Sequence, residues 1–397
     1  MKKTVFIFAF ALIGMTAGAQ CYFQDVTNSE MLRHGTRHAS CRKEVVLPGV
    51  NGYNVYKADL HTHTIYSDGQ VLPKYRVLEA WQDGLDVMAV TEHVEHRPYE
   101  RDMVKYLQKY VSDKYPEAIN ALIQSKPVTE DGIMVDLNTC VKESQKLAEQ
   151  YGLTIIPGCE ITRNGTTIGH FNALFTTDNN AIYDPDPVKA VRNAKAQNAL
   201  VMHNHPGWRK TSLDFTETEK TVYEEGLVDG VEVMNGSEFY PGIIDRVLER
   251  GLFIAANSDI HSTTAEGYRN YGHIRPMTLI FAKDKSLSSL REALVEDRTL
   301  ALGFDTVCGA EQLLKDFFLA GVKTEIIRTD SKGRSLVMLT NCTSVPYFIK
   351  TGDSNPRYLD PFSTISLTSE AGSKVLKVEV LNMFCSKDAH PVIEISF

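Results

Sequence analysis

The sequence has few cysteines, and none of them is spaced as zinc-binding thiolates usually are. Its 397 residues include 7 cysteines, and no two of them form a Cys-x-x-Cys motif. Blocks of lysine and arginine are also absent, and the formal net charge is −8 at pH 7. The chain therefore lacks the basic patch that is typical of nucleic-acid-binding proteins.

Long hydrophobic runs are lacking too, since none reaches the ~20 residues that span a bilayer. Residues 1–20 combine two lysines, an apolar run over residues 4–15 and the small residues of 17–19, which is the pattern of a cleaved secretory signal. We expect an exported, periplasmic or extracellular protein with no transmembrane segment in the mature chain. Cys21 offers the alternative of a lipid anchor, which is less favoured because Gln20 precedes it instead of a small residue.

Short apolar runs alternate with amphipathic stretches from residue 55 to about residue 282. The apolar runs cover residues 55–60, 86–91, 153–156, 168–175, 199–202, 230–234, 253–256 and 278–281. The stretches at 73–82, 187–197 and 241–249 each begin with proline, which favours the first turn of a helix. Repeated strand–helix units predict an α/β fold with a parallel sheet, and seven or eight such units favour a barrel.

The last ~80 residues have a different pattern, with alternating polar and apolar residues between turn signals. The predicted strands are residues 323–328, 335–340, 346–349, 364–367, 374–381 and 392–395. This pattern predicts a small all-β domain of the sandwich type over residues 309–397, joined by a helix over 310–319. Residues 21–308 would form the barrel domain, with 21–52 as an ambiguous arm packed on it.

Histidine and carboxylate residues gather where the predicted strands end. His61 and His63 stand two apart on an extended segment, so both imidazoles point to one side and can hold one metal ion. The other candidates at strand ends are Asp68, His93, Glu160, His170, His203, His205, Asp259 and His261. In β/α barrels these ends form one rim, and a set of His, Asp and Glu suits zinc, manganese or iron.

Several of these segments together resemble the PHP (polymerase and histidinol phosphatase) superfamily of phosphoesterases. They are Asp59-Leu-His-Thr-His-Thr-Ile-Tyr-Ser-Asp-Gly69, Thr91-Glu-His93, Gly158-Cys-Glu160, Asn204-His-Pro206 and Ser258-Asp-Ile-His261. The resemblance spans residues 53–305 and implies a distorted seven-stranded β/α barrel. One departure is Glu92, which stands where many members have Asp; we expect it to affect the surroundings of the ligands.

The resemblance implies two or three divalent metal ions and assigns ligands to each. The first ion would be held by His61, His63, Glu160 and Asp259, the second by Glu160, His170 and His205, and the third by Asp68, His93 and His261. Glu160, Asp259 and His205 are the residues expected to matter most for catalysis. His203 is ambiguous; the Asn204-His205-Pro206 segment favours His205 as the ligand and His203 as its support.

The implied reaction is hydrolysis of a phosphate mono- or diester by attack of metal-bound hydroxide on phosphorus. A small phosphorylated molecule is the expected partner, whereas the oligomeric state does not follow from the sequence. Arg163, Arg269 and Arg275 are candidates for contacting the phosphate, because the guanidinium fork binds it bidentately. For each arginine the alternative is an ordinary salt bridge.

Two other functions remain open on the same residues. Metal-activated water can also hydrolyse amides or carboxylic esters, so the barrel alone does not select phosphorus over carbon. A non-catalytic protein could instead use its C-terminal β domain to bind carbohydrate or a partner. The complete set of candidate ligands argues against the non-catalytic alternative.

Overall fold

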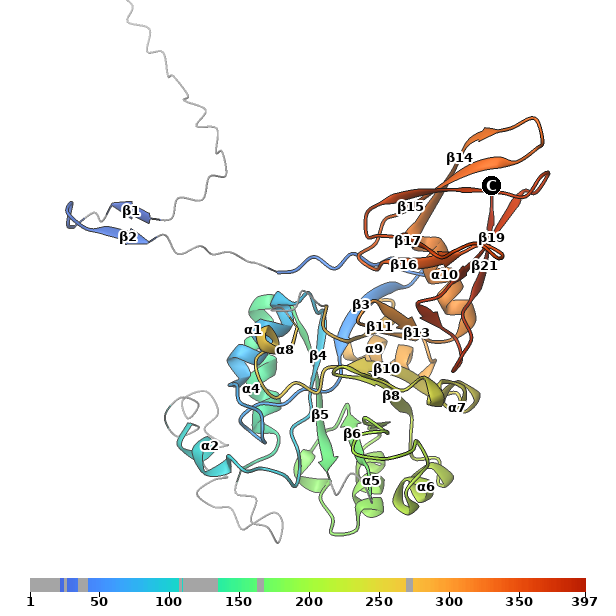
Figure 1. Ribbon diagram of the computed structural model, residues 1–397. Helices are drawn as coiled ribbons and strands as arrows, with labels where there is room; N and C mark the ends of the chain where they lie inside the picture. The colour runs from blue at the N-terminus through green and yellow to red at the C-terminus, as the bar shows by residue number, and fades with distance from the viewer. Residues whose placement is uncertain are drawn as a thin grey trace, which may run out of the picture. The chain divides into compact units, whose positions relative to one another are not determined.

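The computed structural model describes residues 22–24, 27–34, 42–106, 109, 135–162, 168–268 and 274–397 (Figure 1). The chain divides into two compact units, residues 1–41 and 42–397. In the first unit, β1 (Tyr22–Gln24) and β2 (Leu32–His34) form an antiparallel hairpin. The predicted secretory signal and Cys21 lie outside the described residues. Within the described ranges, no helix has both the length and the apolar character to cross a membrane.

The second unit is built on a curled α/β sheet. Its strands are β3 (Asn54–Asp59), β4 (Val87–Val90), β5 (Thr154–Thr162), β6 (His170–Leu174), β7 (Leu200–His203), β8 (Gly230–Asn235), β9 (Glu238–Phe239), β10 (Phe253–Asn257), β11 (Met277–Ala282), β12 (Thr299–Gly303), β13 (Thr306–Cys308) and β20 (Met383–Phe384). Their order is β10-β8-β7-β6-β5-β4-β3-β11-β12-β13-β20, and β9 pairs with β8.

The curvature of the sheet brings β10, at one end of the strand order, against β11 and β12 near the other end. The backbone N–H of Ala256 donates to the Thr278 hydroxyl on β11 at 3.1 Å, and that of Ile254 donates to the Thr299 hydroxyl on β12 at 3.2 Å. Just beyond the strand ends, Thr62 and Ile260 form an isolated parallel bridge. These contacts bring the continuations of β3 and β10 together, so the sheet curls into a barrel-like shape as the alternating pattern predicts.

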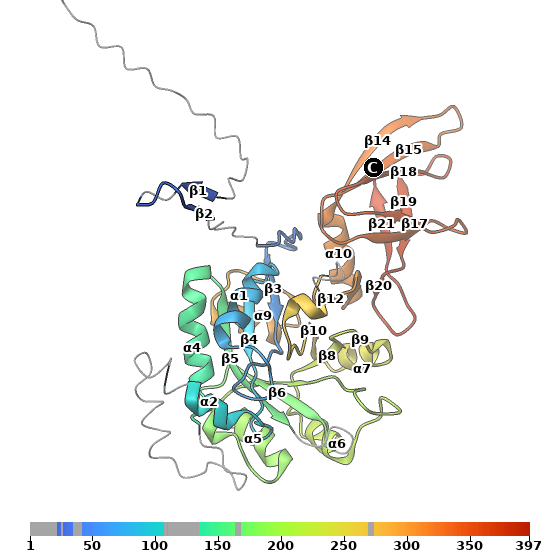
Figure 2. The same ribbon diagram turned by 60° about the vertical axis from the view of Figure 1, so that its left-hand side comes forward.

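Helices lie on the outside of this sheet (Figures 1 and 2). They are α1 (Pro73–Gln82), α2 (Glu100–Tyr106), α4 (Thr139–Ala148), α5 (Pro187–Ala196), α6 (Glu217–Glu224), α7 (Ile244–Glu249), α8 (Thr264–Gly267) and α9 (Leu287–Val295), with single 3-10 turns η2 (Glu149–Tyr151), η3 (Asn179–Ala181) and η4 (Pro241–Ile243). Proline begins α1, α5 and η4 as predicted, since the first helical N–H needs no partner.

The prediction of a parallel sheet is only partly correct. Strand β6 runs antiparallel to both β5 and β7, and β11 runs antiparallel to β3 and β12. A parallel pair needs a crossover of a dozen or more residues, and the link from Thr162 to His170 is too short for one. The connection length therefore decides the direction of β6, which the hydrophobic pattern alone did not reveal.

The C-terminal region is all-β, as predicted, after the connecting helix α10 (Glu311–Gly321). One sheet contains β14 (Val322–Thr329), β15 (Ser335–Asn341) and β18 (Thr364–Thr368), and the other contains β17 (Arg357–Leu359), β16 (Tyr347–Lys350), β19 (Val375–Val380) and β21 (Val392–Ser396). Alternate residues of β15 are buried, which is the expected period of two.

The C-terminal strands are not separate from the barrel. Strand β20 pairs in parallel with β13 at the edge of the barrel sheet. One apolar core also joins Val77 and Met277 of the barrel to Val337 and Tyr347 of the β sheets. Residues 42–50 contribute Val45 to this core, so this part of the expected arm 21–52 packs here, whereas residues 22–34 belong to the first unit.

Candidate metal centre

The candidate ligands lie on or next to six strands of the curled sheet. His61 and His63 follow β3, and His93 follows β4 and forms an isolated bridge with Glu160 of β5. His170 begins β6, His205 lies just after β7, and Asp259 and His261 follow β10. Ligand atoms fall into three overlapping groups, and within each group they lie within 4.8 Å of one another: His63, Asp68, His93 and His261; His61, His63 and Asp259; and His61, Glu160 and His205.

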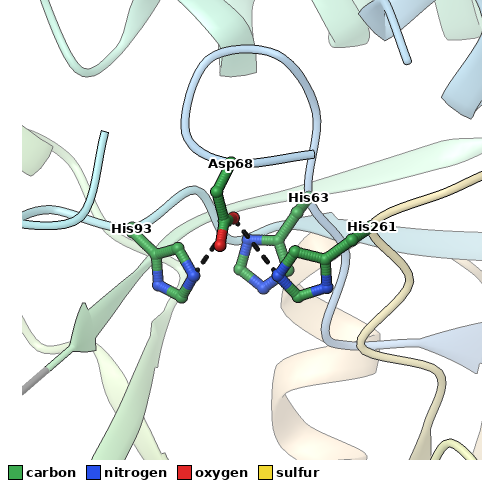
Figure 3. Close-up of side chains that lie close together, drawn as sticks. All are labelled: His63, Asp68, His93 and His261. Atoms are coloured by element: carbon green, nitrogen blue, oxygen red, sulfur yellow. Dashed lines mark ion pairs between the residues drawn. The ribbon is translucent and has the colours of Figure 1, made fainter. Parts of the chain in front are cut away.

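Asp68 is the centre of the first group (Figure 3). Its Oδ1 atom lies 3.3 Å from His93 Nε2 and 3.2 Å from His261 Nε2. The His63 ring stacks against each of these two rings, with centroids 4.3 Å from His93 and 4.4 Å from His261. This is the predicted third ligand set with His63 added to it.

Glu160 connects the other groups, because its two oxygens face different imidazoles. Its Oε2 atom lies 3.4 Å from His61 Nε2 and 3.5 Å from His63 Nε2. Its Oε1 atom lies 3.1 Å from His170 Nδ1 and 3.7 Å from His205 Nε2. A carboxylate placed in this way fits the predicted bridge between two ions.

The buried atoms of the cluster indicate what the site can hold. Within the part of the chain that the structure describes, no hydrogen bond is made by His61 Nε2, His63 Nε2, Asp68 Oδ1, Glu160 Oε2 or Asp259 Oδ1, although all are shielded from solvent. Buried polar atoms left in this state are costly, and the atoms point at one another. Because they are nitrogen and carboxylate donors within a few ångströms, divalent cations fit the site.

The electrostatics favour ionised carboxylates. Burial raises the pKa of Glu160, but His93 and His61 outweigh it and hold that pKa well below its usual value. Burial together with His93 and His261 lowers the pKa of His63 to about 4. The carboxylates are therefore charged and His63 is neutral, which are the forms that bind metals. Burial lowers the pKa of His93, but Glu160 and Asp68 outweigh it and raise that pKa to about 10, so a metal ion bound there would displace a proton from its ring.

Two ligand-bearing residues adopt backbone conformations that side chains rarely take. The φ angle is 25° at His205 and 49° at Asp259. Such angles cost free energy and persist only where the surroundings impose them, which is frequent at functional sites. At Asp259 the turn brings the carboxylate Oδ1 to 3.2 Å from His61 Nε2 and 3.1 Å from His63 Nε2.

Comparison with known proteins agrees with this geometry. The PHP domain family model matches residues 59–270. The crystal structure of a two-domain protein from Bacteroides vulgatus, described as containing a predicted PHP-like metal-dependent phosphoesterase, is 32% identical with a TM-score of 0.76. The match covers 90% of this chain and 99% of that one. This chain belongs to the PHP family.

More distant structures resemble this PHP protein weakly. An amidohydrolase from Chromobacterium violaceum is 14% identical over 52% of this chain and 87% of that one, with a TM-score of 0.35. A similarity this weak gives no information about the activity of this chain. No curated protein sequence matches the chain.

The PHP site includes a carboxylate that sequence reasoning missed. Glu232 of β8 is fully buried, and its Oε1 lies 2.8 Å from His61 Nδ1. Its Oε2 accepts from the His205 backbone N–H and from Asn235 Nδ2, each at 2.8 Å. The available signal was a charged residue between Val231 and Val233 in a buried strand, where an unpaired carboxylate would be costly.

We expect Glu232→Gln to weaken metal binding about 10- to 100-fold, because His61 loses the carboxylate that orients its ring. Competition with a chelator of known affinity would measure the change. Glu225→Gln, which alters an exposed ion pair with Arg192, is the matched control and should leave the affinity unchanged. Equal affinities of the Glu232 variant and the wild type would contradict this role.

Glu92 supports the ligands, as expected from its departure from the family pattern. Its carboxylate accepts hydrogen bonds from Thr64 Oγ1 at 2.7 Å, from the Thr64 backbone N–H at 3.2 Å and from Ser67 Oγ. It thereby holds the turn that carries Asp68. A Cβ atom on Gly69 in the same turn would lie 2.7 Å from the His63 carbonyl carbon, so the turn requires glycine.

The predicted phosphate contact by Arg275 needs correction. Arg275 is only 2% exposed, and its guanidinium pairs with Asp59 and lies 3.3 Å from Asp83. Because this guanidinium is paired with two buried carboxylates, it cannot also bind the phosphate of a substrate. The other two candidates, Arg163 and Arg269, lie outside the described residues.

His203 does not join the ligand groups. Its Nε2 lies 3.0 Å from Glu219 Oε1, and its Nδ1 lies 3.0 Å from the Tyr223 hydroxyl. Both partners belong to α6, on the outside of the sheet. The structure thus brings His205 to Glu160 and turns His203 away from it.

Proposed function

We propose that this PHP-family protein is an exported metal-dependent phosphoesterase that hydrolyses a small phosphate mono- or diester. The observation that carries the proposal is Glu160, whose two carboxylate oxygens face imidazoles on both sides of one buried cluster. Export rests on the sequence of residues 1–20. We propose two or three ions per chain, with zinc, manganese or iron as the candidates.

The proposed ligand sets are those that the family resemblance implies, and they overlap in part with the groups of neighbouring ligand atoms in the structure. His61, His63, Glu160 and Asp259 would hold one ion, Glu160, His170 and His205 a second, and Asp68, His93 and His261 a third, with His63 facing the third as well. When bound, such ions activate water as a nucleophile near neutral pH and offset the charge that develops on phosphoryl oxygens.

The protein residues orient these groups and restrict solvent. Glu232 fixes His61, and Arg76 on α1 donates from Nε to the His63 carbonyl at 2.9 Å and from Nη2 to the Ser262 carbonyl at 2.9 Å. The ligand-bearing ends of β3 and β10 are therefore held by one buried guanidinium. Positioning of this kind contributes to catalysis because the substrate meets a preformed set of charges.

The test is an assay of the metal-loaded protein against phosphate monoesters, phosphate diesters, carboxylic esters and amides. We expect turnover of a phosphate ester that stops on chelation and returns when metal is restored. Turnover of amides or carboxylic esters alone would contradict the proposal in favour of the other hydrolase. Retention of metal without any turnover would favour a binding protein.

A further inference from the structure

The segment after His205 places an aromatic ring and a cation against the cluster. The Trp208 ring centroid lies 5.3 Å from the His205 ring and 5.4 Å from the His170 ring. The Arg209 guanidinium carbon lies 4.2 Å above the centroid of the Trp208 ring. Trp208 is half-buried and Arg209 is exposed, so the guanidinium lies on the solvent side of the pair.

The conformation of this pair is held by the surrounding backbone and side chains. Arg209 has a φ angle of 55°, and the Trp208 backbone N–H donates to the His205 carbonyl at 2.9 Å. The next residue, Lys210, reaches the buried Glu219 carboxylate with Nζ at 2.5 and 2.6 Å. Both neighbours of Arg209 are thus anchored, and its backbone holds a conformation that persists only where the surroundings impose it.

The charge of Arg209 is available to a ligand. Within the described ranges, Arg209 forms no ion pair, whereas Arg97 pairs with Glu100 and Arg275 pairs with Asp59. A guanidinium held over an aromatic face is attracted to the ring without using its N–H donors on a carboxylate. Those donors match the oxygens of a phosphoryl group and can bind two of them at once.

We propose that Arg209, seated on Trp208, binds phosphoryl oxygens of the substrate and makes the site selective for dianionic phosphate monoesters over monoanionic diesters. This inference rests on the proposed phosphoesterase function. Trp208 is in ring contact with His170 and carries the Arg209 guanidinium, so Arg209 borders the cluster on this side. A monoester offers one more charged oxygen than a diester, so it gains more from a cation outside the metal ligands.

The test compares Arg209→Met with wild type on p-nitrophenyl phosphate and on bis(p-nitrophenyl) phosphate. We expect kcat/KM for the monoester to fall about 10- to 100-fold, as for a lost charge-assisted hydrogen bond, and that for the diester to fall less than about threefold. Arg209→Lys keeps the positive charge but not the guanidinium fork, so its kcat/KM for the monoester should lie between the values of wild type and Arg209→Met. Arg192→Met, on the exposed face of α5, is the control and should behave as wild type.

A binding measurement separates this inference from the proposed function. Titration of inorganic phosphate into the metal-loaded protein should show about 10- to 100-fold weaker binding to the Arg209→Met variant, with unchanged metal content. Equal phosphate affinity in the two proteins, or equal losses with both substrates, would overturn the role of Arg209. If wild type cleaves no phosphate ester, the proposed function fails, and the phosphate titration still decides whether Arg209 binds the anion.

Discussion

Replacing Glu160 with alanine should remove bound metal and lower the rate of hydrolysis about 1000-fold or more. The carboxylate faces His61, His63, His170 and His205, so its loss removes a ligand from two of the proposed ligand sets at once. Loss of a bridging ligand forfeits several kcal/mol of charge stabilisation, and each 1.4 kcal/mol is a factor of ten in rate. Metal content by mass spectrometry and steady-state kinetics would measure both effects.

A more conservative change and a distant one serve as controls. Glu160→Gln keeps the size and one acceptor oxygen, and we expect it to retain more metal than the alanine variant while remaining slow. Glu292→Ala alters an exposed ion pair with Arg298 and should change neither measurement. Unchanged metal content and rate in Glu160→Ala would rule out the bridging role.

Arg275→Met should destabilise the protein by about 3–5 kcal/mol, which is the usual cost of leaving one partner of a buried ion pair alone. Asp59 is fully buried, and its Oδ1 also accepts from the backbone N–H groups of His61 and Ser258 at 3.1 and 3.2 Å. Its charge therefore cannot move to solvent without disturbing the loops that carry ligands. Urea unfolding of the metal-free protein would give the change in the free energy of unfolding.

The exposed pair of Arg334 and Asp330 provides a matched comparison. Arg334→Met removes the same type of group from solvent-exposed surroundings, and we expect the free energy of unfolding to fall by less than about 1 kcal/mol. Adding Asp59→Asn to Arg275→Met should recover part of the lost stability, because it removes the unpaired charge. Equal losses of stability in Arg275→Met and Arg334→Met would refute the structural role of Arg275.

Much of the fold and most of the ligand groups follow from local patterns. The two-residue spacing of His61 and His63 predicts that they share a side, and the structure places both Nε2 atoms beside Asp259. Alternation along 335–340 likewise predicts a half-buried strand, which is β15. In these cases a single strand determines which way the side chains point, so a short stretch of sequence is enough to predict it.

The remaining features depend on residues far apart in the chain. Arg275 resembles any other arginine until the fold brings it to Asp59, 216 positions earlier. The role of Glu232 becomes clear only once His61 is known to lie beside it, and that of Arg209 only once Trp208 is known to lie against His170. The sequence pattern identifies the candidate metal ligands better than it identifies the residues that hold those ligands in place.

The pairing of β20 with β13 has a consequence for the order of folding during synthesis. Residues 383–384 are synthesised well after the other strands of the sheet whose edge they form. Domains generally fold from the N-terminus as they emerge, but this sheet cannot be completed until β20 has left the ribosome. The β13 edge is therefore open to pairing with other chains until β20 covers it.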